Sequence, residues 1–300
     1  MAGLRGIVLL VTAFAWVAFA TACGGTPPAG GSGIKVEACE NFWGSLASQL
    51  GGSKVSVHSV VTDPNADPHE YETSIADARA FAEADLVILN GAGYDTWGQK
   101  LLDANSSSHR QVLNIAQLVG RNPGDNPHFW YNPTYAVAAA DEITAEYKAI
   151  DAGDASYFDQ QRAAFTTALK PYTNLVAQIR TRFAGTPIGS TESIFVYMAA
   201  ALGLDLISPP DFMNAIAEGT DPPAASVATF HDQVANKEIR VLVYNVQASS
   251  AITATLKQLA EQNRIPLVGV SETLQPPGAT FEDWQVRQLM QLEAALSSSA

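Results

Sequence analysis

The stretch Leu86-Val87-Ile88-Leu89-Asn90 decides the fold, because it is an uncharged apolar run that ends at a polar residue. Such a short run without polar alternation is typical of a strand that is buried on both faces of a parallel sheet. Similar runs recur before residue 115 and again after residue 185. The further strands that we expect are Ile34–Ala38, Val55–Val61, Val112–Asn114, Pro187–Ser190, Asp205–Ile207, Ile239–Tyr244 and Pro266–Val270.

Helical segments alternate with these strands, and the alternation favours parallel sheets. Ser74 and Asp77 have the spacing of a capping box, which predicts the start of one helix. The two prolines within Ser208–Asp211 predict a loop in the second half of the chain. The other helices that we expect are Thr134–Ile150, Ile194–Leu202, Ala225–Val234, Ala251–Gln262 and Trp284–Leu296.

The segment Tyr157–Phe183 separates the two halves and is predicted to be a long helix. From Phe165 onward its apolar residues recur every three or four positions, which places them on one face. Pro171 lies inside the segment and predicts either a kink or two consecutive helices. We therefore predict an α/β fold with two lobes, each a mostly parallel four-stranded sheet with flanking helices, joined by one long linking helix. The expected boundaries are 34–150 for the N-terminal lobe, 151–185 for the linking helix and 186–300 for the C-terminal lobe.

Residues 1–22 have the features of a signal peptide. Arg5 is their single charge, and the apolar run after it is shorter than the roughly 20 residues that span a bilayer. Ala20–Gly24 resembles a bacterial lipobox, although Ala20 stands where Leu is usual. The resemblance implies cleavage before Cys23 and lipidation of that cysteine, and an ordinary cleaved signal peptide is the alternative. Residues 23–33 are rich in Gly, Pro and Ser, which predicts a flexible tether.

Composition limits the class of protein. The 300 residues are 47% hydrophobic and 16% charged, which excludes a disordered chain. Two cysteines exclude a disulfide scaffold, and if Cys23 is lipidated we expect Cys39 to be a buried apolar thiol rather than a ligand or a nucleophile. With 17 basic and 30 acidic residues the net charge is −13, so a nucleic acid is not expected as a partner.

Four ionisable residues follow closely on expected strands, namely His69, His128, Glu192 and Glu272. Ligands of open α/β sheets bind at the carboxyl ends of the strands, so these side chains are expected to face one cleft between the lobes. Two imidazoles and two carboxylates form a suitable cage for a borderline divalent cation. Taken singly, each residue also fits a structural role, since both carboxylates are placed to cap the helices that follow them.

Three more polar residues are expected to support these ligands. Asp67 and Glu70 flank His69, and Asn245 follows another strand end. Hydrogen bonds from such neighbours orient metal ligands and tune their basicity. We therefore expect Asp67, Glu70 and Asn245 to touch the ligands rather than the ion.

The segment Asp67–Glu72, together with Ala84–Gly91, is similar to the zinc- and manganese-binding component of metal ABC importers, the cluster A-I solute-binding proteins. The resemblance extends from about Ile34 to Leu296, and Asn126–Trp130 matches the second histidine site of that family. It implies Glu192 and Glu272 at the third and fourth sites.

The resemblance also implies a function. It implies one divalent ion held between two lobes joined by a rigid helix, no catalysis, and delivery of the ion to a cognate permease driven by a separate ATPase. We accordingly expect an extracytoplasmic monomer that is anchored to the outer face of the cytoplasmic membrane only through its N-terminal lipid.

The identity of the ion stays open at this point. The fourth site of the family is often Asp, and Glu272 is one methylene longer. Manganese members carry Glu at the third site where many zinc members carry His, so Glu192 favours the harder ion. The general affinity order nevertheless favours Zn²⁺ over Mn²⁺ at a nitrogen and oxygen site. The expected cargo is one Zn²⁺ or Mn²⁺ ion, with Fe²⁺ as a further candidate.

Other functions remain as alternatives. The same four ligands would suit a secreted metal-dependent hydrolase if one coordination position stayed open to water. An adhesion or interaction module on this fold would bind no ion, and a vitamin or siderophore binder would need a wider cleft. The sequence has no P-loop, no GxGxxG after a strand, no GxSxG and no HExxH. The resemblance implies that the protein is not an enzyme.

Overall fold

The computed structural model describes residue 1 and residues 33–64, 68 and 71–298. Outside this range lie nearly all of the predicted signal peptide and tether, together with four residues discussed above: Cys23, Asp67, His69 and Glu70. Within the described residues, no helix is both long enough and apolar enough to cross a membrane.

The first sheet is parallel throughout, with the strand order β2-β1-β3-β4. Val36 on β1 pairs with Val57 on one side and with Leu86 on the other. The strands lie at the predicted apolar runs, and β1 continues two residues beyond the predicted end. Their bounds are β1 (Ile34–Glu40), β2 (Val55–Val61), β3 (Leu86–Leu89) and β4 (Gln111–Asn114).

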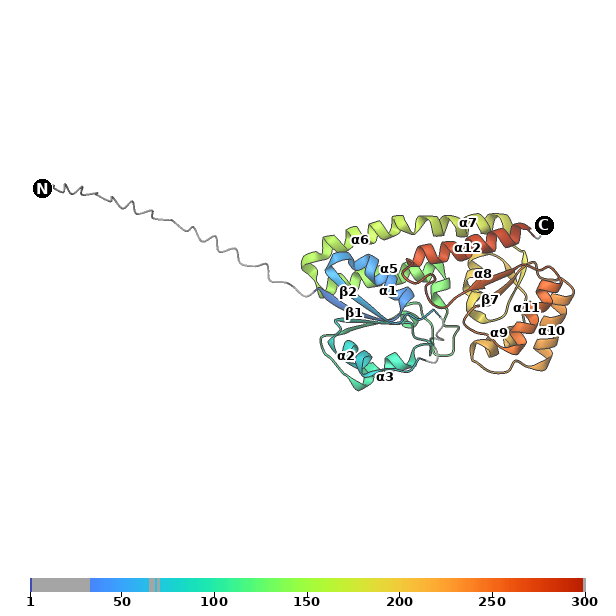
Figure 1. The fold of residues 1–300 in the computed structure, drawn as a ribbon, viewed down its shortest axis with the longest axis horizontal. Helices are drawn as coiled ribbons and strands as arrows, with labels where there is room; N and C mark the ends of the chain where they lie inside the picture. Colours follow the sequence, from blue (N-terminus) through green and yellow to red (C-terminus); the bar gives the residue numbers. More distant parts are fainter. Residues whose placement is uncertain (2–32, 65–67, 69–70, 299–300) are drawn as a thin grey trace. The chain divides into compact units, whose positions relative to one another are not determined.

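Helices cover both faces of this sheet (Figure 1). Side chains of β3 alternate between the faces, since Leu86 and Ile88 join one buried cluster while Val87 and Leu89 join another. The predicted capping box is confirmed at the start of α2, where the Asp77 amide donates to Ser74 Oγ at 3.2 Å. The helices are α1 (Asn41–Gly51), α2 (Ile75–Glu83), α3 (Thr96–Ala104), α4 (Ile115–Leu118) and α5 (Pro133–Ile150).

The second sheet is also parallel and four-stranded, with the order β6-β5-β7-β8. β7 begins at Leu242 rather than at the predicted Ile239, because pairing with β5 and β8 starts at Leu242; Ile239 is apolar because it packs in the hydrophobic core. The bounds are β5 (Pro187–Ser190), β6 (Asp205–Leu206), β7 (Leu242–Asn245) and β8 (Leu267–Val270).

The helices of the second lobe include one that the sequence analysis missed. The loop predicted for Ser208–Asp211 ends at Pro210, which is the first residue of α9. A proline fits this position because the amide of the first helical residue has no partner within the helix. The helices are α8 (Val196–Leu202), α9 (Pro210–Ala217), α10 (Ala224–Ala235), α11 (Ala251–Gln262) and α12 (Phe281–Ser298).

The link between the lobes consists of two consecutive helices, α6 (Ala155–Ala168) and α7 (Lys170–Phe183). Leu169 joins them and keeps nearly helical dihedral angles, φ −74° and ψ −14°. Pro171 lies in the first turn of α7, where its missing amide leaves no hydrogen bond unmade. The two helices follow one another without a long loop, and α12 packs along α7 (Figure 1).

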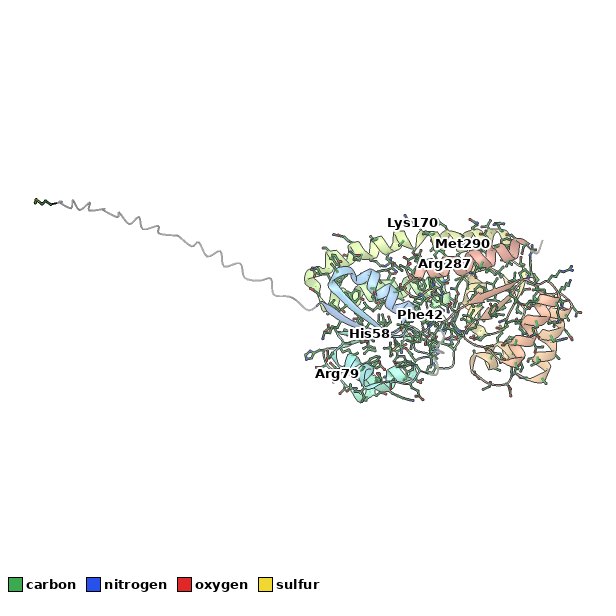
Figure 2. The ribbon with its side chains drawn as sticks, in the orientation of Figure 1. Phe42, His58, Arg79, Lys170, Arg287 and Met290 are labelled. Carbon is green, nitrogen blue, oxygen red and sulfur yellow. The ribbon has the colours of Figure 1, made fainter. Side chains whose placement is uncertain are left out.

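The hydrophobic core continues from one sheet to the other. Phe42 on α1 stacks on Trp130 with ring centroids 4.1 Å apart, and Trp284 on α12 lies 6.4 Å from Phe42. Figure 2 labels Phe42 within the molecule, whereas Lys170 and Met290 lie on exposed helix faces. Aromatic rings from both lobes therefore pack directly beside the segment that carries His128.

Candidate metal centre

Three of the predicted ligands meet in one buried cluster. His128, Glu192 and Glu272 are 0%, 1% and 3% exposed, and each offers a donor atom within 4.8 Å of the donor atoms of the other two. Nε2 of His128 lies 3.2 Å from Oε1 of Glu192. His128 comes from the first lobe, after β4 and α4, and Glu192 and Glu272 come from the second lobe, just after β5 and β8.

His128 is held by the residues that precede it. Oδ1 of Asn126 accepts a hydrogen bond from the backbone amide of His128 at 3.0 Å and lies 2.7 Å from Nδ1 of the ring. An amide oxygen only accepts, so Nδ1 carries a proton and the Nε2 lone pair faces Glu192. Two acceptors 3.2 Å apart need a proton or a cation between them, and a metal ion meets this need.

Glu192 follows β5 on a short polar turn. The Ser190 hydroxyl donates to the backbone carbonyl of Glu192 at 2.7 Å, and the Asn126 amide donates to the carbonyl of Ser193 at 2.7 Å. The second contact crosses from the first lobe to the second. Asn126 therefore fixes both the His128 ring and the turn that carries Glu192.

Glu272 follows β8 and is held from both lobes. Its backbone amide donates to Oε1 of Gln247 at 2.6 Å, and the Tyr94 hydroxyl donates to its Oε2 at 2.7 Å. Tyr94 is 1% exposed, so this bond is shielded from water. A charge-assisted hydrogen bond in such a place is stronger than one on the surface.

Asn245 joins the two carboxylates. Its Nδ2 lies 2.5 Å from Oε2 of Glu192 and 2.5 Å from Oε1 of Glu272. An amide nitrogen carries two hydrogens, so it donates to both carboxylates at once. This arrangement is the one expected of a residue that supports metal ligands without touching the ion.

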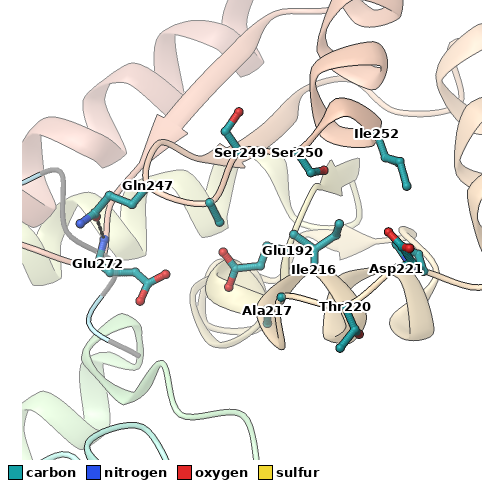
Figure 3. A pocket seen from close by; sticks show the side chains of 13 residues that line it. Glu192, Ile216, Ala217, Thr220, Asp221, Gln247, Ser249, Ser250, Ile252 and Glu272 are labelled. Atoms are coloured by element: carbon teal, nitrogen blue, oxygen red, sulfur yellow. Dashed lines mark hydrogen bonds between the residues drawn. The ribbon is translucent and has the colours of Figure 1, made fainter. Parts of the chain in front are cut away.

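A cavity of about 250 Å³ opens onto this cluster from the second lobe. Glu192 and Glu272 both line it, and Figure 3 shows their carboxylates in it with Gln247 bonded to the Glu272 backbone. Thr220 and Asp221 line it further from the cluster (Figure 3). The lining is rich in oxygen atoms, which suits the passage of a partly hydrated cation.

Aromatic residues after His128 pack against its ring. Trp130 is fully buried, with its ring centroid 5.2 Å from that of His128 and 5.2 Å from that of Tyr94. Such packing keeps bulk water away from the ligands and lowers the local dielectric constant. A cation between the carboxylates is then attracted more strongly than it would be at the surface.

The predicted ligands are not all described. His69, Asp67 and Glu70 lie outside the described residues, so their part in the centre stays a prediction. Tyr94 and Asn126 contact the ligands but were not singled out from the sequence. A weak signal existed for Tyr94, because it follows β3 at the same sheet edge as the ligands.

The chain was compared with known proteins. Residues 36–295 match the family model described as ZnuA, zinc-uptake complex component A, periplasmic. The metal ABC transporter substrate-binding lipoprotein FimA of Streptococcus parasanguinis is 24% identical over 265 residues, 82% of each chain. The high-affinity zinc uptake system protein ZnuA of Bacillus subtilis is 20% identical, with 97% of each chain covered.

Solved structures show the same fold. The Mn-bound S38A mutant of a periplasmic metal binding protein from Candidatus Liberibacter asiaticus has a TM-score of 0.74 at 18% identity, covering 88% of this chain and 99% of that one. The SBP FpvC of Pseudomonas aeruginosa, in complex with Mn²⁺, has a TM-score of 0.73 at 18% identity, covering 89% and 100%. The family model spans most of the chain and the fold agrees with it, so the protein belongs to the ZnuA family.

Proposed function

We propose that this protein binds one divalent transition-metal ion, Zn²⁺ or Mn²⁺, outside the cytoplasm and delivers it to an ABC-type metal importer. The observation that carries the proposal is the buried cluster of His128, Glu192 and Glu272 in a chain of this family. Two buried carboxylates that share one amide donor are stable only with a compensating cation or with protons. The cluster therefore supports binding of a cation rather than of an anion or an apolar ligand.

The donor set of the proposed site is one imidazole and two carboxylates, to which we add His69 as the fourth ligand. Nitrogen and oxygen donors without sulfur suit Zn²⁺, Mn²⁺ and Fe²⁺. Relatives are named for both leading ions, since PsaA of Streptococcus pneumoniae is called a manganese and ZnuA of Bacillus subtilis a zinc protein. We propose Zn²⁺ or Mn²⁺ as the cargo, with Fe²⁺ as a third candidate.

The proposal includes the location of the protein. We propose that residues 1–22 are a signal peptide, that Cys23 is lipidated and that residues 23–33 tether the binding body to the membrane. The lipobox-like sequence supports this proposal, as do several relatives that are named lipoproteins. The lobes would span 34–150 and 186–300, with 151–185 between them. The partners would be a permease and its ATPase, and the protein would act as a monomer and not as an enzyme.

The experiment that tests the function is a competitive titration of metal-free protein with Zn²⁺, Mn²⁺ and Fe²⁺, followed by calorimetry and by thermal unfolding. An ion that binds only the folded state at 100 times its Kd should raise the free energy of unfolding by about 2.7 kcal/mol. Glu192→Gln keeps the shape of the side chain but removes the charge. If its Kd rises 100-fold, the gain at the same ion concentration falls to about 0.4 kcal/mol.

Two controls make this result decisive. Elemental analysis of the protein as isolated should find about one ion per chain, and a chelator should remove it. Glu238→Gln is the matched control, because Glu238 is exposed on the second lobe away from the cluster. The proposal is wrong if Glu192→Gln and His69→Ala both keep the full thermal gain.

A further inference from the structure

A second group of metal-binding side chains lies beyond β1, outside the site proposed above. Cys39, Glu40 and Asp95 are 0%, 0% and 3% exposed, and their donor atoms all lie within 4.8 Å of one another. None of them is a proposed ligand of the first site. The group combines one sulfur with two carboxylates, so its chemistry differs from that of the first site.

The buried carboxylate of Glu40 is the strongest indication of a bound cation in this group. It is fully buried, and neither of its carboxylate oxygens accepts a hydrogen bond from any other described residue. Burial raises the pKa of this carboxyl well above its usual range, and the nearby carboxylates of Asp95 and Glu272 raise the pKa further. A buried carboxyl without partners is unfavourable unless a proton or a cation sits on it.

Cys39 and Asp95 complete the group on a rigid frame. The backbone amides of Asn90 and Gly91 donate to Asp95 at 2.6 Å and 2.8 Å, so this carboxylate is fixed in place. The Cys39 thiol packs under α3, where a Cβ atom on Gly98 would lie only 2.7 Å from Sγ. Burial raises the pKa of this thiol, and the neighbouring Asp95 and Glu40 carboxyls raise it further.

The sequence analysis expected Cys39 to be a buried apolar thiol. Its burial is confirmed, but its neighbours are not all apolar. Val87 and Trp97 belong to the same hydrophobic cluster as Cys39, and the two carboxyl groups each offer an oxygen within 4.8 Å of its Sγ. The two acids disfavour a thiolate at Cys39 and hold it as a neutral thiol that hydrogen-bonds to Asp95, so a bound cation is what would turn it into a thiolate ligand.

We propose that Cys39, Glu40 and Asp95 hold a second divalent ion of the thiophilic class, Zn²⁺ or Cd²⁺, through Sγ and one oxygen of each carboxylate. On binding, the S–H bond of Cys39 breaks and its proton passes to the solvent, while bonds form from Sγ and from one oxygen of each carboxylate to the metal. Thiolate ligands select such ions over Mn²⁺. The two sites would therefore differ in the ions they prefer.

The second site adjoins the first. Asp95 directly follows Tyr94, whose hydroxyl holds Glu272. Asn41, which directly follows Glu40, accepts the backbone amide of Leu274 at 3.0 Å. Residues next to the second group therefore contact residues of the first. The two groups have no ligand in common, so a mutation can remove either site and leave the other.

The test uses the full chain carrying Cys23→Ser, which leaves Cys39 as its only thiol. The metal-free protein is titrated with Cd²⁺ at neutral pH, and the near-ultraviolet thiolate-to-cadmium band is recorded together with bound cadmium by equilibrium dialysis. We expect about two equivalents of Cd²⁺ per chain, one of which produces the band, while Mn²⁺ fills about one equivalent and produces none.

Matched variants separate the two sites. Glu40→Gln keeps the side-chain volume, and Cys39→Ser removes the sulfur, so each should lose the band and one equivalent of Cd²⁺ but keep Mn²⁺ binding. Glu192→Gln should lose Mn²⁺ binding and keep the band. Circular dichroism checks that each variant is folded. If Cys39→Ser does not fold, the result for Glu40→Gln alone decides whether the second site exists.

Two outcomes would overturn the second site: a folded parent chain that binds Cd²⁺ without the band, or a band that survives Glu40→Gln. The first site has its own criterion, because Mn²⁺ binding that survives Glu192→Gln refutes the proposed function and leaves the thiolate band to decide on Cys39.

Discussion

The Tyr94 hydroxyl donates a 2.7 Å hydrogen bond to Oε2 of Glu272, although the two residues are 178 positions apart in the chain. Tyr94 follows β3 of the first sheet, and Glu272 follows β8 of the second. A hydroxyl group of the first lobe therefore orients a carboxylate of the second lobe. The metal affinity of the proposed site then depends on Tyr94, although Tyr94 is not one of its ligands.

Replacing Tyr94 by Phe should weaken metal binding without unfolding the protein. Loss of a hydrogen bond that orients a metal ligand typically costs 10- to 100-fold in affinity, so we expect Kd to rise by about that factor. Competition with a fluorescent chelator measures it. Tyr157→Phe is the control, since its hydroxyl accepts the Ser53 amide at 2.8 Å far along the chain from the site. Equal affinities in the two variants would show that the Tyr94 hydroxyl does not orient Glu272.

Asn245→Leu should destabilise the metal-free protein. The variant keeps the approximate shape but removes the donor between Glu192 and Glu272, so two buried carboxylates lose a partner. We expect the free energy of unfolding to fall by about 1–3 kcal/mol in chelator. Urea denaturation measures the loss, and saturating metal should reduce it because the ion then neutralises both carboxylates. Asn263→Leu is the control, as its amide only bonds the Leu259 carbonyl at the end of α11.

Glu192→His should change the selectivity of the site. Imidazole suits Zn²⁺ better than Mn²⁺, whereas a carboxylate suits the harder ion. We expect the ratio of the Mn²⁺ and Zn²⁺ dissociation constants to rise by about tenfold, or about 1.4 kcal/mol. Isothermal titration with each ion measures the two constants. A ratio that stays unchanged would mean that residue 192 does not ligate the ion.

Asp77→Asn should destabilise the protein at neutral pH but not in acid. Burial raises the pKa of Asp77, but hydrogen bonds from Ser74 and Tyr71 outweigh this effect, and the net pKa lies below the usual 3.8. A depressed pKa contributes stability that is present above the unfolded-state pKa and is lost as pH falls through the folded-state value. We expect a loss of about 1 kcal/mol at pH 7.

The measurement for Asp77 is urea denaturation at several pH values. The difference between wild type and Asp77→Asn should shrink as the pH falls below 3.8 and through the lower folded-state pKa, because the wild-type carboxylate is then protonated too. Asp103→Asn serves as the control, since Asp103 is an exposed acid of α3 outside any capping box. A loss that is equally large in acid would contradict the role of the carboxylate charge.

Much of the fold could be predicted because its strands are short, apolar and separated by helices. Leu86–Leu89 is buried on both faces, so its apolar character follows directly from its place in the sheet. Errors occurred where local signals conflict. Pro210 indicates a loop when it is considered alone, but it also fits the first position of a helix.

The candidate site could be predicted only in part. The sequence singled out His128, Glu192 and Glu272 because strand ends can be recognised in it, and the structure places these three side chains together. Tyr94 was not singled out, because its partner Glu272 is 178 positions away. Asn126 was not singled out either, because its contact with the Ser193 carbonyl, 67 positions away, exists only in the folded chain. Glu40 escaped notice because it lies two residues beyond the predicted end of β1.

Helix α12 has a consequence for how an ion leaves the protein. It packs along α7 and against β8, and its first residue, Phe281, donates its amide to Ser45 in α1 at 3.0 Å. Further along, Gln288 lies 2.7 Å from the hydroxyl of Tyr131 in the first lobe. A rotation that parts the two sheets must break these contacts as well as bend α7. We therefore expect that the transporter of the proposed function releases the ion by displacing the short loops around the cavity, rather than by separating the two lobes.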